Sequence, residues 1–316
     1  MELCKDKISV IIPVRNEGKK IHSCLNAVVN QSQTPYEIIV VDGHSSDDTV
    51  KKAQNYPVKI LYEEYKTRAG ACNVGLESAT GEYVAFTDAD CIPKRDWLET
   101  ELRVLKKHKN TAGVGCRIEN ISKGIWEETI NEISKTFIGS GRSIQGRQFT
   151  KEKKVVSISG CHALYRKKML VDAGGFNVRL KTCEDTEINK RLRKNGYNLI
   201  YSPRTSVLHD HTRGTKLFAR RMFQYGWGRA QSRLFDMQLL LPLSLPFLLL
   251  CVIFLPFIFW FTVILYCLLL LVFSISITAK NKKPQLIFTV PFIIVIQHIV
   301  YSLGFWRGLL SERGTR

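Results

Sequence analysis

Two carboxylates, Asp88 and Asp90, stand at the end of an apolar run and are the first candidates for chemistry. The stretch YVAFTDADCIP at 83–93 predicts a buried strand that ends at these residues. In an extended chain, side chains at i and i+2 point to the same side, so two like charges would face one spot. Such a pair costs stability unless a cation or several donors lie between the carboxylates.

Carboxylate oxygens of this kind suit Mg²⁺ or Mn²⁺, whose shells are commonly completed by water and substrate phosphates. The Asp88–Asp90 pair therefore predicts a metal site with a diphosphate-bearing ligand, against the simpler interpretation of a turn or helix cap. The adjacent Cys91 is too soft a ligand for such an ion.

The elements that must position this pair follow an alternating pattern over residues 1–117. We predict strands at 8–14, 37–42, 58–62, 83–88 and 112–116, and helices at about 17–30, 46–55, 69–79 and 96–108. This alternation indicates an α/β fold with a mostly parallel sheet and helices on both faces. Ligands of such sheets bind at the carboxyl ends of the strands, which places 13–17, 42–48 and 88–90 on one rim.

A second part of the domain begins at 155, after a basic and irregular segment at 118–154 that predicts a mobile loop and a variable insertion. This part contains a predicted helix at 183–196 and a strand at 197–203, and it ends in SVLHDHT at 206–212.

Four motifs, in order over about residues 7–212, resemble those of family 2 glycosyltransferases. VIIPVRNEG resembles the opening strand, and IIVVDGHSSDDT resembles a V-D-D-G-S-x-D-x-T segment with Gly43 and His44 in place of Asp-Gly. TRAGACNVGLESATGEYVAFTDADC resembles the stretch that leads into the D-x-D motif. GCHALYRKKMLVDAGGFN and CEDTEINKRLRKNGY resemble the acceptor-side segment that ends in Glu-Asp.

This resemblance implies a GT-A fold and an inverting transfer of sugar from a nucleotide-diphosphate sugar. On the matching positions, Asp42 would hold the base or ribose, and Pro13 and Glu17 would shape the nucleotide pocket. Arg68 would lie along the nucleotide, and Asp88 would contact the ribose and metal region.

The resemblance also implies that Asp90 binds the metal, Mg²⁺ or Mn²⁺, directly and that Asp185 is the base on the acceptor side. By its local pattern, Thr182 to Asp185 is close to a capping box, and Gly196 ends the following helix. The two roles are compatible, because a helix N-terminus keeps a carboxylate ionised and fixed, as a general base requires. Asp185 would take the proton of an acceptor hydroxyl as that oxygen attacks the anomeric carbon.

His209 and His211 lie two residues apart at a predicted strand end. One interpretation makes them surface or capping residues. In the other, His209 completes the metal shell, as a late histidine does in some D-x-D transferases. Two histidines alone do not make a zinc site.

The C-terminal part predicts a membrane anchor. No charged residue occurs over 239–278, and a further apolar stretch follows at 285–304. Because about 20 apolar residues span a bilayer, we predict transmembrane helices at about 239–257, 260–278 and 285–304 rather than a buried helix pair. Basic residues on both flanks of 239–278 indicate an even number of crossings between them, with the flanks and the catalytic domain on the cytosolic side. The third stretch either spans, is re-entrant or lies in the interface.

The composition of the chain limits the classes of partner that we expect it to bind. The chain of 316 residues has 46 Lys and Arg against 28 Asp and Glu, a net charge of +18, which favours phosphorylated ligands or an anionic membrane surface. The sequence contains no recognisable nucleic-acid-binding motif, so we expect no nucleic acid partner. Nine scattered cysteines without a CxxC pair fit a reducing compartment, and the N-terminus has no signal-peptide pattern.

These observations give a predicted domain plan. A cytosolic GT-A catalytic domain occupies 1–212, with a nucleotide-sugar-binding half at 7–117 and an acceptor half at 155–212. A basic, aromatic interfacial helix at 213–236 would lie in the lipid headgroups. A transmembrane region at 237–305 and a tail at 306–316 complete the multi-pass cell-membrane protein.

We predict a metal-dependent inverting glycosyltransferase that acts on a hydroxyl of a lipid-linked or other membrane-associated glycan. The helix at 216–235 lacks the Q-x-x-R-W motif of processive polysaccharide synthases, which favours a distributive enzyme. One alternative is a polyprenyl-phosphate sugar synthase, whose acceptor oxygen is already ionised and needs no base. Another is a non-catalytic membrane scaffold with the same fold.

Overall fold

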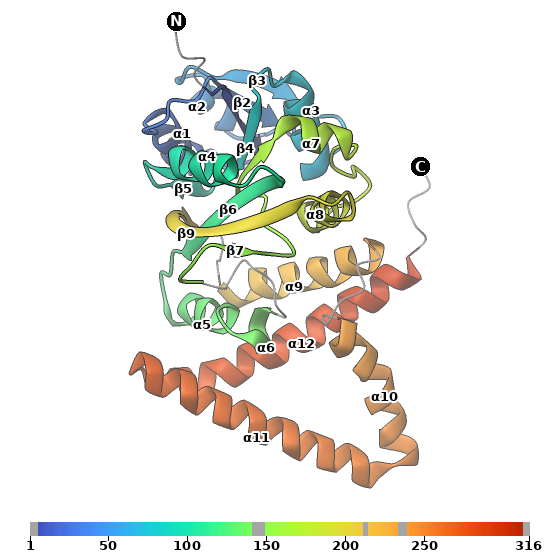
Figure 1. Ribbon diagram of the computed structural model, residues 1–316. Helices are drawn as coiled ribbons and strands as arrows, with labels where there is room; N and C mark the ends of the chain where they lie inside the picture. Colours follow the sequence, from blue (N-terminus) through green and yellow to red (C-terminus); the bar gives the residue numbers. More distant parts are fainter. Residues whose placement is uncertain (1–5, 141–148, 211–213, 233–238, 312–316) are drawn as a thin grey trace, which may run out of the picture. The chain divides into compact units, whose positions relative to one another are not determined.

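The computed structural model describes residues 6–140, 149–210, 214–232 and 239–311 (Figure 1). The chain divides into two compact units, which are described separately. Unit 1 comprises Met1–Asn120 and Gln148–His211, and unit 2 comprises Ile121–Arg147 and Thr212–Arg316.

Unit 1 is built on one mixed sheet. Its strands are β1 (Ile8–Val14), β2 (Glu37–Asp42), β3 (Lys59–Tyr62), β4 (Tyr83–Thr87), β5 (Cys91–Pro93), β6 (Thr111–Asn120), β7 (Lys153–Lys154), β8 (His162–Arg166) and β9 (Asn198–His209). The order across the described sheet is β3-β2-β1-β4-β8-β6-β9-β5, with β7 paired to β9. The strands β1, β2, β3, β4, β6 and β9 run in one direction, and β5, β7 and β8 run in the other. The predicted mostly parallel sheet is thus found, with three antiparallel strands inserted in its second half.

The alternation of side chains along β1 separates two apolar layers. Val10 and Ile12 belong to one buried cluster and Ile11 to the other, because successive side chains point to opposite faces. The first layer contains α1 (Ile21–Val29), α2 (Thr49–Ala53) and α4 (Trp97–Lys107). The second contains α3 (Arg68–Ser78), α7 (Lys167–Asp172) and α8 (Glu184–Lys194). Helices therefore cover both faces, as the alternating pattern predicts.

Unit 2 is helical over its described residues. Its helices are α5 (Ile125–Ser134), α6 (Phe137–Ser140), α9 (Gly214–Gln231), α10 (Leu240–Phe254), α11 (Pro256–Asn281) and α12 (Leu286–Leu310). The prediction of a loop over 118–154 is therefore wrong for 125–140. Ile130 and Ile133 of α5 are buried in a cluster with Val290 and Ile293 of α12, and the Thr129 and Thr289 hydroxyls are 2.7 Å apart. Residues 141–148 of that segment lie outside the described residues.

The helices α9 and α12 approach each other closely at glycines. A Cβ built on Gly304 would lie 2.1 Å from the Phe223 carbonyl oxygen, and one on Gly226 would lie 2.0 Å from that of Tyr301. Any larger residue at these positions would force the helices apart. The described part of the predicted interfacial helix is therefore a packing partner of α12.

Two helices of unit 2 are long and apolar enough to cross a membrane, by length and composition. They are α11, with a mean hydropathy of 2.7 and 11% of its apolar window buried, and α12, with 2.1 and 39%. The helix α10 is apolar but has 15 residues, about 22 Å at 1.5 Å per residue, which is less than a bilayer core of about 30 Å. Over its described residues, the first of the three predicted spans is thus too short to cross a bilayer by itself.

Candidate active site

The candidate site lies in unit 1, where several strands end. The loops after β1, β2 and β4 meet there with the segment before β8, the start of α8 and the end of β9. This is the predicted rim, joined by three further segments that the order of strands along the chain does not reveal.

Asp88 and Asp90 have different ionic partners. Residues 89–90 form a turn, so the extended geometry assumed for the pair ends at Thr87. The Asp88 carboxylate accepts hydrogen bonds from Arg68, whereas Asp90 Oδ2 lies 3.6 Å from the Nζ atom of Lys20. Each carboxylate thus has its own cation, which relieves the repulsion between two like charges.

Arg68 joins the donor-side and acceptor-side motifs. Its Nε and Nη2 atoms donate to Asp88 Oδ1 at 3.0 and 2.7 Å, and Nη1 donates to Glu184 Oε1 at 3.0 Å. Nη2 also donates to the Gly160 carbonyl at 3.0 Å. Arg68 is the first residue of α3, and the Thr67 side chain caps that helix by accepting from the Gly70 amide. The start of α3 therefore fixes the backbone position from which the Arg68 side chain extends.

The charges around Arg68 shift the protonation equilibria of the cluster. Burial acts to lower the pKa of the guanidinium, but Asp88, Cys72 and Glu184 hold it well above its usual value. Burial raises the pKa of Glu184, Arg68 lowers it and Asp185 raises it again, with a net upward shift. A shifted carboxyl next to Asp185 is typical of a functional site.

Asp185 is held in the first turn of α8. Its Oδ2 accepts from the Gly160 amide at 3.2 Å, and its Oδ1 accepts from the Thr186 amide at 2.6 Å. The capping-box prediction is wrong: the N-cap residue is Cys183, in a left-handed conformation with φ of 66°, and its side chain makes no capping hydrogen bond. The chain turns into α8 one residue later than a Thr182 cap would require. Gly196 follows the helix end at Lys194, as predicted.

Left-handed backbone accompanies the site loops. Among the described non-glycine residues of unit 1, Asn16 (φ 55°), His44 (φ 58°), Lys66 (φ 56°) and Cys183 (φ 66°) have positive φ, and each lies within a few residues of a predicted site residue. Such conformations cost energy and are retained where the surroundings over-determine them, commonly at functional sites.

Asp90 and His209 lie close enough to share a divalent cation. Asp90 Oδ1 lies 3.4 Å from His209 Nε2, so a single ion could contact both atoms. The Asp90 carbonyl accepts from the Asp210 amide at 3.0 Å, which ties the turn to the end of β9. Burial lowers the pKa of His209, whereas Cys161 and Asp90 raise it, and the net shift is upward. Asp88 is engaged by Arg68, and His211 lies outside the described residues.

The predicted nucleotide pocket consists of two loops that bind each other. Asp42 is buried, and its two carboxylate oxygens accept from the Ser45 hydroxyl at 2.5 Å and the Ser45 amide at 2.9 Å. The Glu17 amide donates to Thr49 Oγ1 at 2.9 Å. Pro13 lies within β1, paired with Val41. Asp42 thus shapes the loop after β2, and its oxygens are already occupied by that loop.

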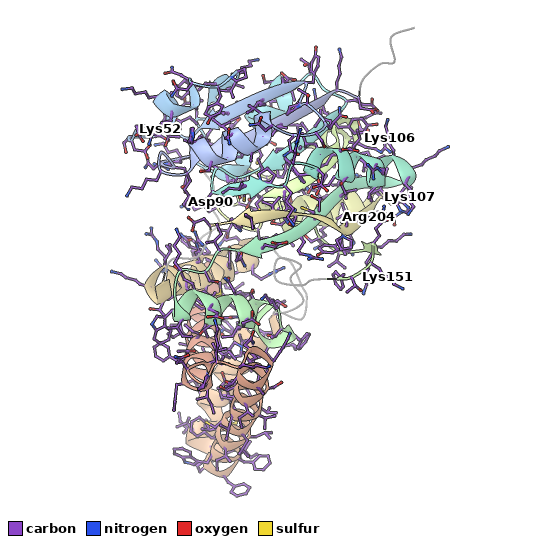
Figure 2. All side chains as sticks on the ribbon, turned by 90° about the vertical axis from the view of Figure 1, so that its left-hand side faces the viewer. Lys52, Asp90, Lys106, Lys107, Lys151 and Arg204 are labelled. Carbon is purple, nitrogen blue, oxygen red and sulfur yellow. The ribbon has the colours of Figure 1, made fainter. Side chains whose placement is uncertain are left out.

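A basic cavity of unit 1 lies away from this rim. It measures about 520 Å³ and is lined by Lys107, His108, Thr150, Lys151, Glu152, Lys153, Lys154, Ile200, Pro203 and Arg204. Figure 2 shows Asp90 well separated from Lys107, Lys151 and Arg204. The cavity is therefore distinct from the Asp90–His209 pair.

Comparison with known proteins assigns the family. The model of glycosyl transferase family 2 matches residues 9–174, more than half of the chain and most of the segment that carries the site. The chain belongs to glycosyl transferase family 2. It is an enzyme with a GT-A fold, as the four motifs predict, and the non-catalytic scaffold is excluded as the main interpretation.

Relatives of this family 2 glycosyltransferase include two archaeal enzymes. The dolichyl N-acetyl-α-D-glucosaminyl phosphate 3-β-D-2,3-diacetamido-2,3-dideoxy-β-D-glucuronosyltransferase of Methanococcus voltae is 29% identical, over 98% of each chain. Glycosyltransferase AglE of Haloferax volcanii is 28% identical, over 72% of this chain and 75% of its own. Among solved structures, the mannosyltransferase PcManGT of Pyrobaculum calidifontis, in complex with GDP-Man and Mn²⁺, superposes with a TM-score of 0.62. It is 19% identical and covers 93% of this chain and 86% of its own, which supports the fold.

Sequence reasoning missed several residues of this site in the family 2 glycosyltransferase. Lys20 follows an equally basic Lys19 and carries no signal of its own, yet its Nζ donates to the Asp210 carbonyl at 2.7 Å and lies beside Asp90. Gly160 and Cys161 lie just before β8, a strand that the sequence pattern does not predict. Their place on the rim depends on β8 running antiparallel to β4.

Proposed function

We propose that the chain is a metal-dependent, inverting glycosyltransferase that transfers sugar from a nucleotide-diphosphate sugar to a hydroxyl of a lipid-linked glycan. The observation that carries this proposal is the position of Arg68. One guanidinium contacts Asp88 on the donor side and both Glu184 and Gly160 on the acceptor side. Asp185, next to Glu184 and bonded to Gly160, is thereby held near the donor carboxylates.

The side chains divide the reaction as follows. Asp185 accepts the proton of the acceptor hydroxyl as that oxygen forms a bond to the anomeric carbon. The bond from the anomeric carbon to the diphosphate breaks in the same displacement, which inverts the configuration. The Gly160 and Thr186 amides orient the Asp185 carboxylate for this transfer.

Asp90 and His209 would hold Mg²⁺ or Mn²⁺, and the ion would stabilise negative charge on the departing diphosphate. Lys20, 3.6 Å from Asp90, places another positive charge at the same position. Arg68 fixes Asp88 for contact with the donor nucleotide. Glu17 and the loops around Ser45 form the outer wall of that pocket.

The acceptor assignment is supported by the relatives. The name of the Methanococcus voltae enzyme describes transfer to a dolichyl N-acetylglucosaminyl phosphate, a lipid-linked sugar with free hydroxyls. Such an acceptor needs a base, which Asp185 can supply. A polyprenyl-phosphate acceptor would be ionised already and would leave Asp185 without a catalytic task.

We further propose that α10 and α11 enter the bilayer and that unit 1 is cytosolic. Large apolar side chains of both helices are exposed, including Phe257 at 82% and Phe254 at 71%. The helix α12 packs on α5, α9 and α11 along one face, yet Phe288 and Leu310 are each 79% exposed, so the third apolar stretch keeps both its spanning and its interfacial alternatives. Lys280 in the last turn of α11, with Lys282 and Lys283 just after the helix, is consistent with a cytosolic end.

The decisive experiment is the variant Asp185→Asn in the full-length protein in detergent. We expect sugar transfer to fall by about 10²–10⁴-fold, since the amide cannot accept the proton. Affinity for the nucleotide sugar with Mn²⁺, measured by calorimetry across UDP-, GDP- and dTDP-sugars, should change little. Polyprenyl phosphate and a polyprenyl-phosphate-linked sugar are compared as acceptors.

Glu187→Gln is the matched control, because Glu187 is in the same helical turn but pairs with Arg191. It should keep nearly full activity. If Asp185→Asn transfers sugar at the full rate, Asp185 has only a structural role at the start of α8. If the protein transfers sugar to polyprenyl phosphate but not to the linked sugar, the acceptor assignment is wrong. Unchanged transfer in a chelator would overturn the metal dependence.

A further inference from the structure

A compact group of soft ligands lies directly behind the proposed donor-metal pair. Cys91 Sγ, Cys161 Sγ and a ring nitrogen of His209 lie within 4.8 Å of one another. All three residues are buried, with 0, 4 and 6% of their surface exposed. None of the proposed catalytic steps uses either thiol.

Three separate elements bring these ligands together. Cys91 opens β5 and His209 ends β9, and the two are directly paired across the antiparallel strands. Side chains of such a pair lie on the same face of the sheet, a few ångströms apart. Cys161 comes from the segment just before β8, and its sulfur lies 3.3 Å from the Ser159 hydroxyl. The convergence is fixed by backbone pairing and not by flexible surface side chains.

A fourth ligand, Asp90 Oδ1, completes the group. It lies 3.4 Å from His209 Nε2 and 3.9 Å from Cys91 Sγ. A tetrahedral zinc site with bonds of about 2.0–2.3 Å has ligand-to-ligand distances of roughly 3.3–3.8 Å. The two distances to Asp90 match or closely approach that range, and the Cys91, Cys161 and His209 ligand atoms, which lie within 4.8 Å of one another, need to move inward by at most about 1.5 Å.

We propose that Cys91, Cys161, His209 and Asp90 form a site for a soft divalent cation, with Zn²⁺ as the expected ion. Two sulfur ligands select Zn²⁺ over Mg²⁺ and Mn²⁺, which prefer oxygen. Because Asp90 and His209 are shared, an ion bound to the thiolates withdraws both from the donor metal. This consequence for activity rests on the proposed function, whereas the binding of Zn²⁺ does not. Zn²⁺ would thus inhibit sugar transfer in competition with Mn²⁺.

The test uses full-length protein in detergent, stripped of metal and kept reduced, with Co²⁺ as the probe. We expect one equivalent of Co²⁺ to give an intense thiolate-to-cobalt charge-transfer absorption that one equivalent of Zn²⁺ abolishes. Cys91→Ser and Cys161→Ser should lose this absorption. Cys116→Ser is the matched comparison, since Cys116 is equally buried and belongs to a second group of possible metal ligands, with Glu101 and His162, that could also bind the probe. It should retain the absorption.

Absence of the absorption in the wild-type protein, or its loss in Cys116→Ser alone, would overturn the proposal. A second measurement, made on the wild-type protein, tests the proposal even if the cysteine variants do not fold. In wild-type protein, Zn²⁺ should raise the melting temperature by several degrees and, in mild denaturant that opens the buried thiols to solvent, protect Cys91 and Cys161, but not Cys116, from alkylation. Equal alkylation of all three would also overturn the site.

Activity assays separate this site from the proposed function. Zn²⁺ should inhibit Mn²⁺-supported transfer, and a folded Cys161→Ser variant should need at least about tenfold more Zn²⁺ for the same inhibition. If a chelator leaves transfer unchanged while the Co²⁺ absorption is present, the metal dependence of the proposed function fails and the soft-metal site stands.

Discussion

At the scale of single residues, the site depends on how charges are paired. Arg68 contacts Asp88 and Glu184, and its side chain is 26% exposed, so these pairs are only partly screened by water. Removing the planar guanidinium would leave two carboxylates near Asp185 without their shared donor. The pairing therefore affects both the stability of unit 1 and the geometry of the base.

We predict that Arg68→Lys lowers the free energy of unfolding by about 1–3 kcal/mol, because one ammonium cannot serve both carboxylates. Sugar transfer should fall by about 10–100-fold through misplacement of the reacting groups. Thermal unfolding and steady-state kinetics of the full-length protein measure the two effects.

Arg103→Lys provides the matched comparison. Arg103 pairs with Glu99 at 2.7 Å on the surface of α4, with side chains 62 and 46% exposed. Exposed pairs contribute little, so stability should change by less than about 0.5 kcal/mol. Equal changes in the two variants would show that the Arg68 contacts are worth no more than a surface pair.

At the scale of elements, glycines decide how α9 packs on α12. The backbone contacts of Gly226 and Gly304 leave no room for a Cβ, and Gly308 faces Trp227 at 2.6 Å from its Cβ position. By its sequence alone, the segment that ends at Gly304 predicts an apolar transmembrane helix. Close contact along α9 instead gives α12 a protein-covered face within unit 2.

We predict that Gly304→Ala destabilises unit 2 by about 1–3 kcal/mol, since the added methyl group meets a backbone oxygen that cannot move freely. The melting temperature should fall, and trypsin should cut faster after Arg220 and Arg221 of α9. Gly124→Ala is the control, because no atom lies within 4 Å of its Cβ position. Unchanged proteolysis in Gly304→Ala would contradict the close approach of the two helices.

At the scale of the whole molecule, the exposed apolar surface of α10 and α11 needs a partner. The helix α11 has 26 residues, about 39 Å in length, and exceeds a bilayer core of about 30 Å. Leu255 breaks the helix between α10 and α11, with φ of −141°, and Pro256 starts the second helix. The two helices meet at this break and diverge from it, and both carry exposed apolar side chains (Figure 1).

We predict that the chain stays in the membrane fraction after washing with high salt and alkaline carbonate. In a Cys4→Ser, Cys183→Ser background, Cys267, which is exposed on α11, should react with a hydrophilic maleimide only after detergent is added. A cysteine introduced by Lys282→Cys should react in lysed membranes but not in intact cells. Its labelling in intact cells would reverse the proposed orientation, and extraction by carbonate would remove the membrane assignment.

The sequence alone determined the features that depend on local pattern. The alternation of apolar runs and amphipathic segments predicted an α/β sheet with helices on both faces, and ordered motifs around Asp42, Asp90 and Asp185 identified the family. The uncharged run at 239–278 predicted the apolar helices. Each signal lies within a short window, where side-chain period, capping and length are visible without knowledge of the fold.

The tertiary structure determined the contacts between residues that are far apart in the sequence. Arg68 and Glu184 are 116 residues apart, Lys20 and Asp210 are 190 apart, and residues 125–134 form a helix that packs on α12. No local pattern specifies these partners, because they follow from the antiparallel insertion of β8 and the pairing of β5 with β9. The turn at 89–90 gives Asp88 and Asp90 different ionic partners, and the pairing of β5 with β9 helps to place two thiols near Asp90.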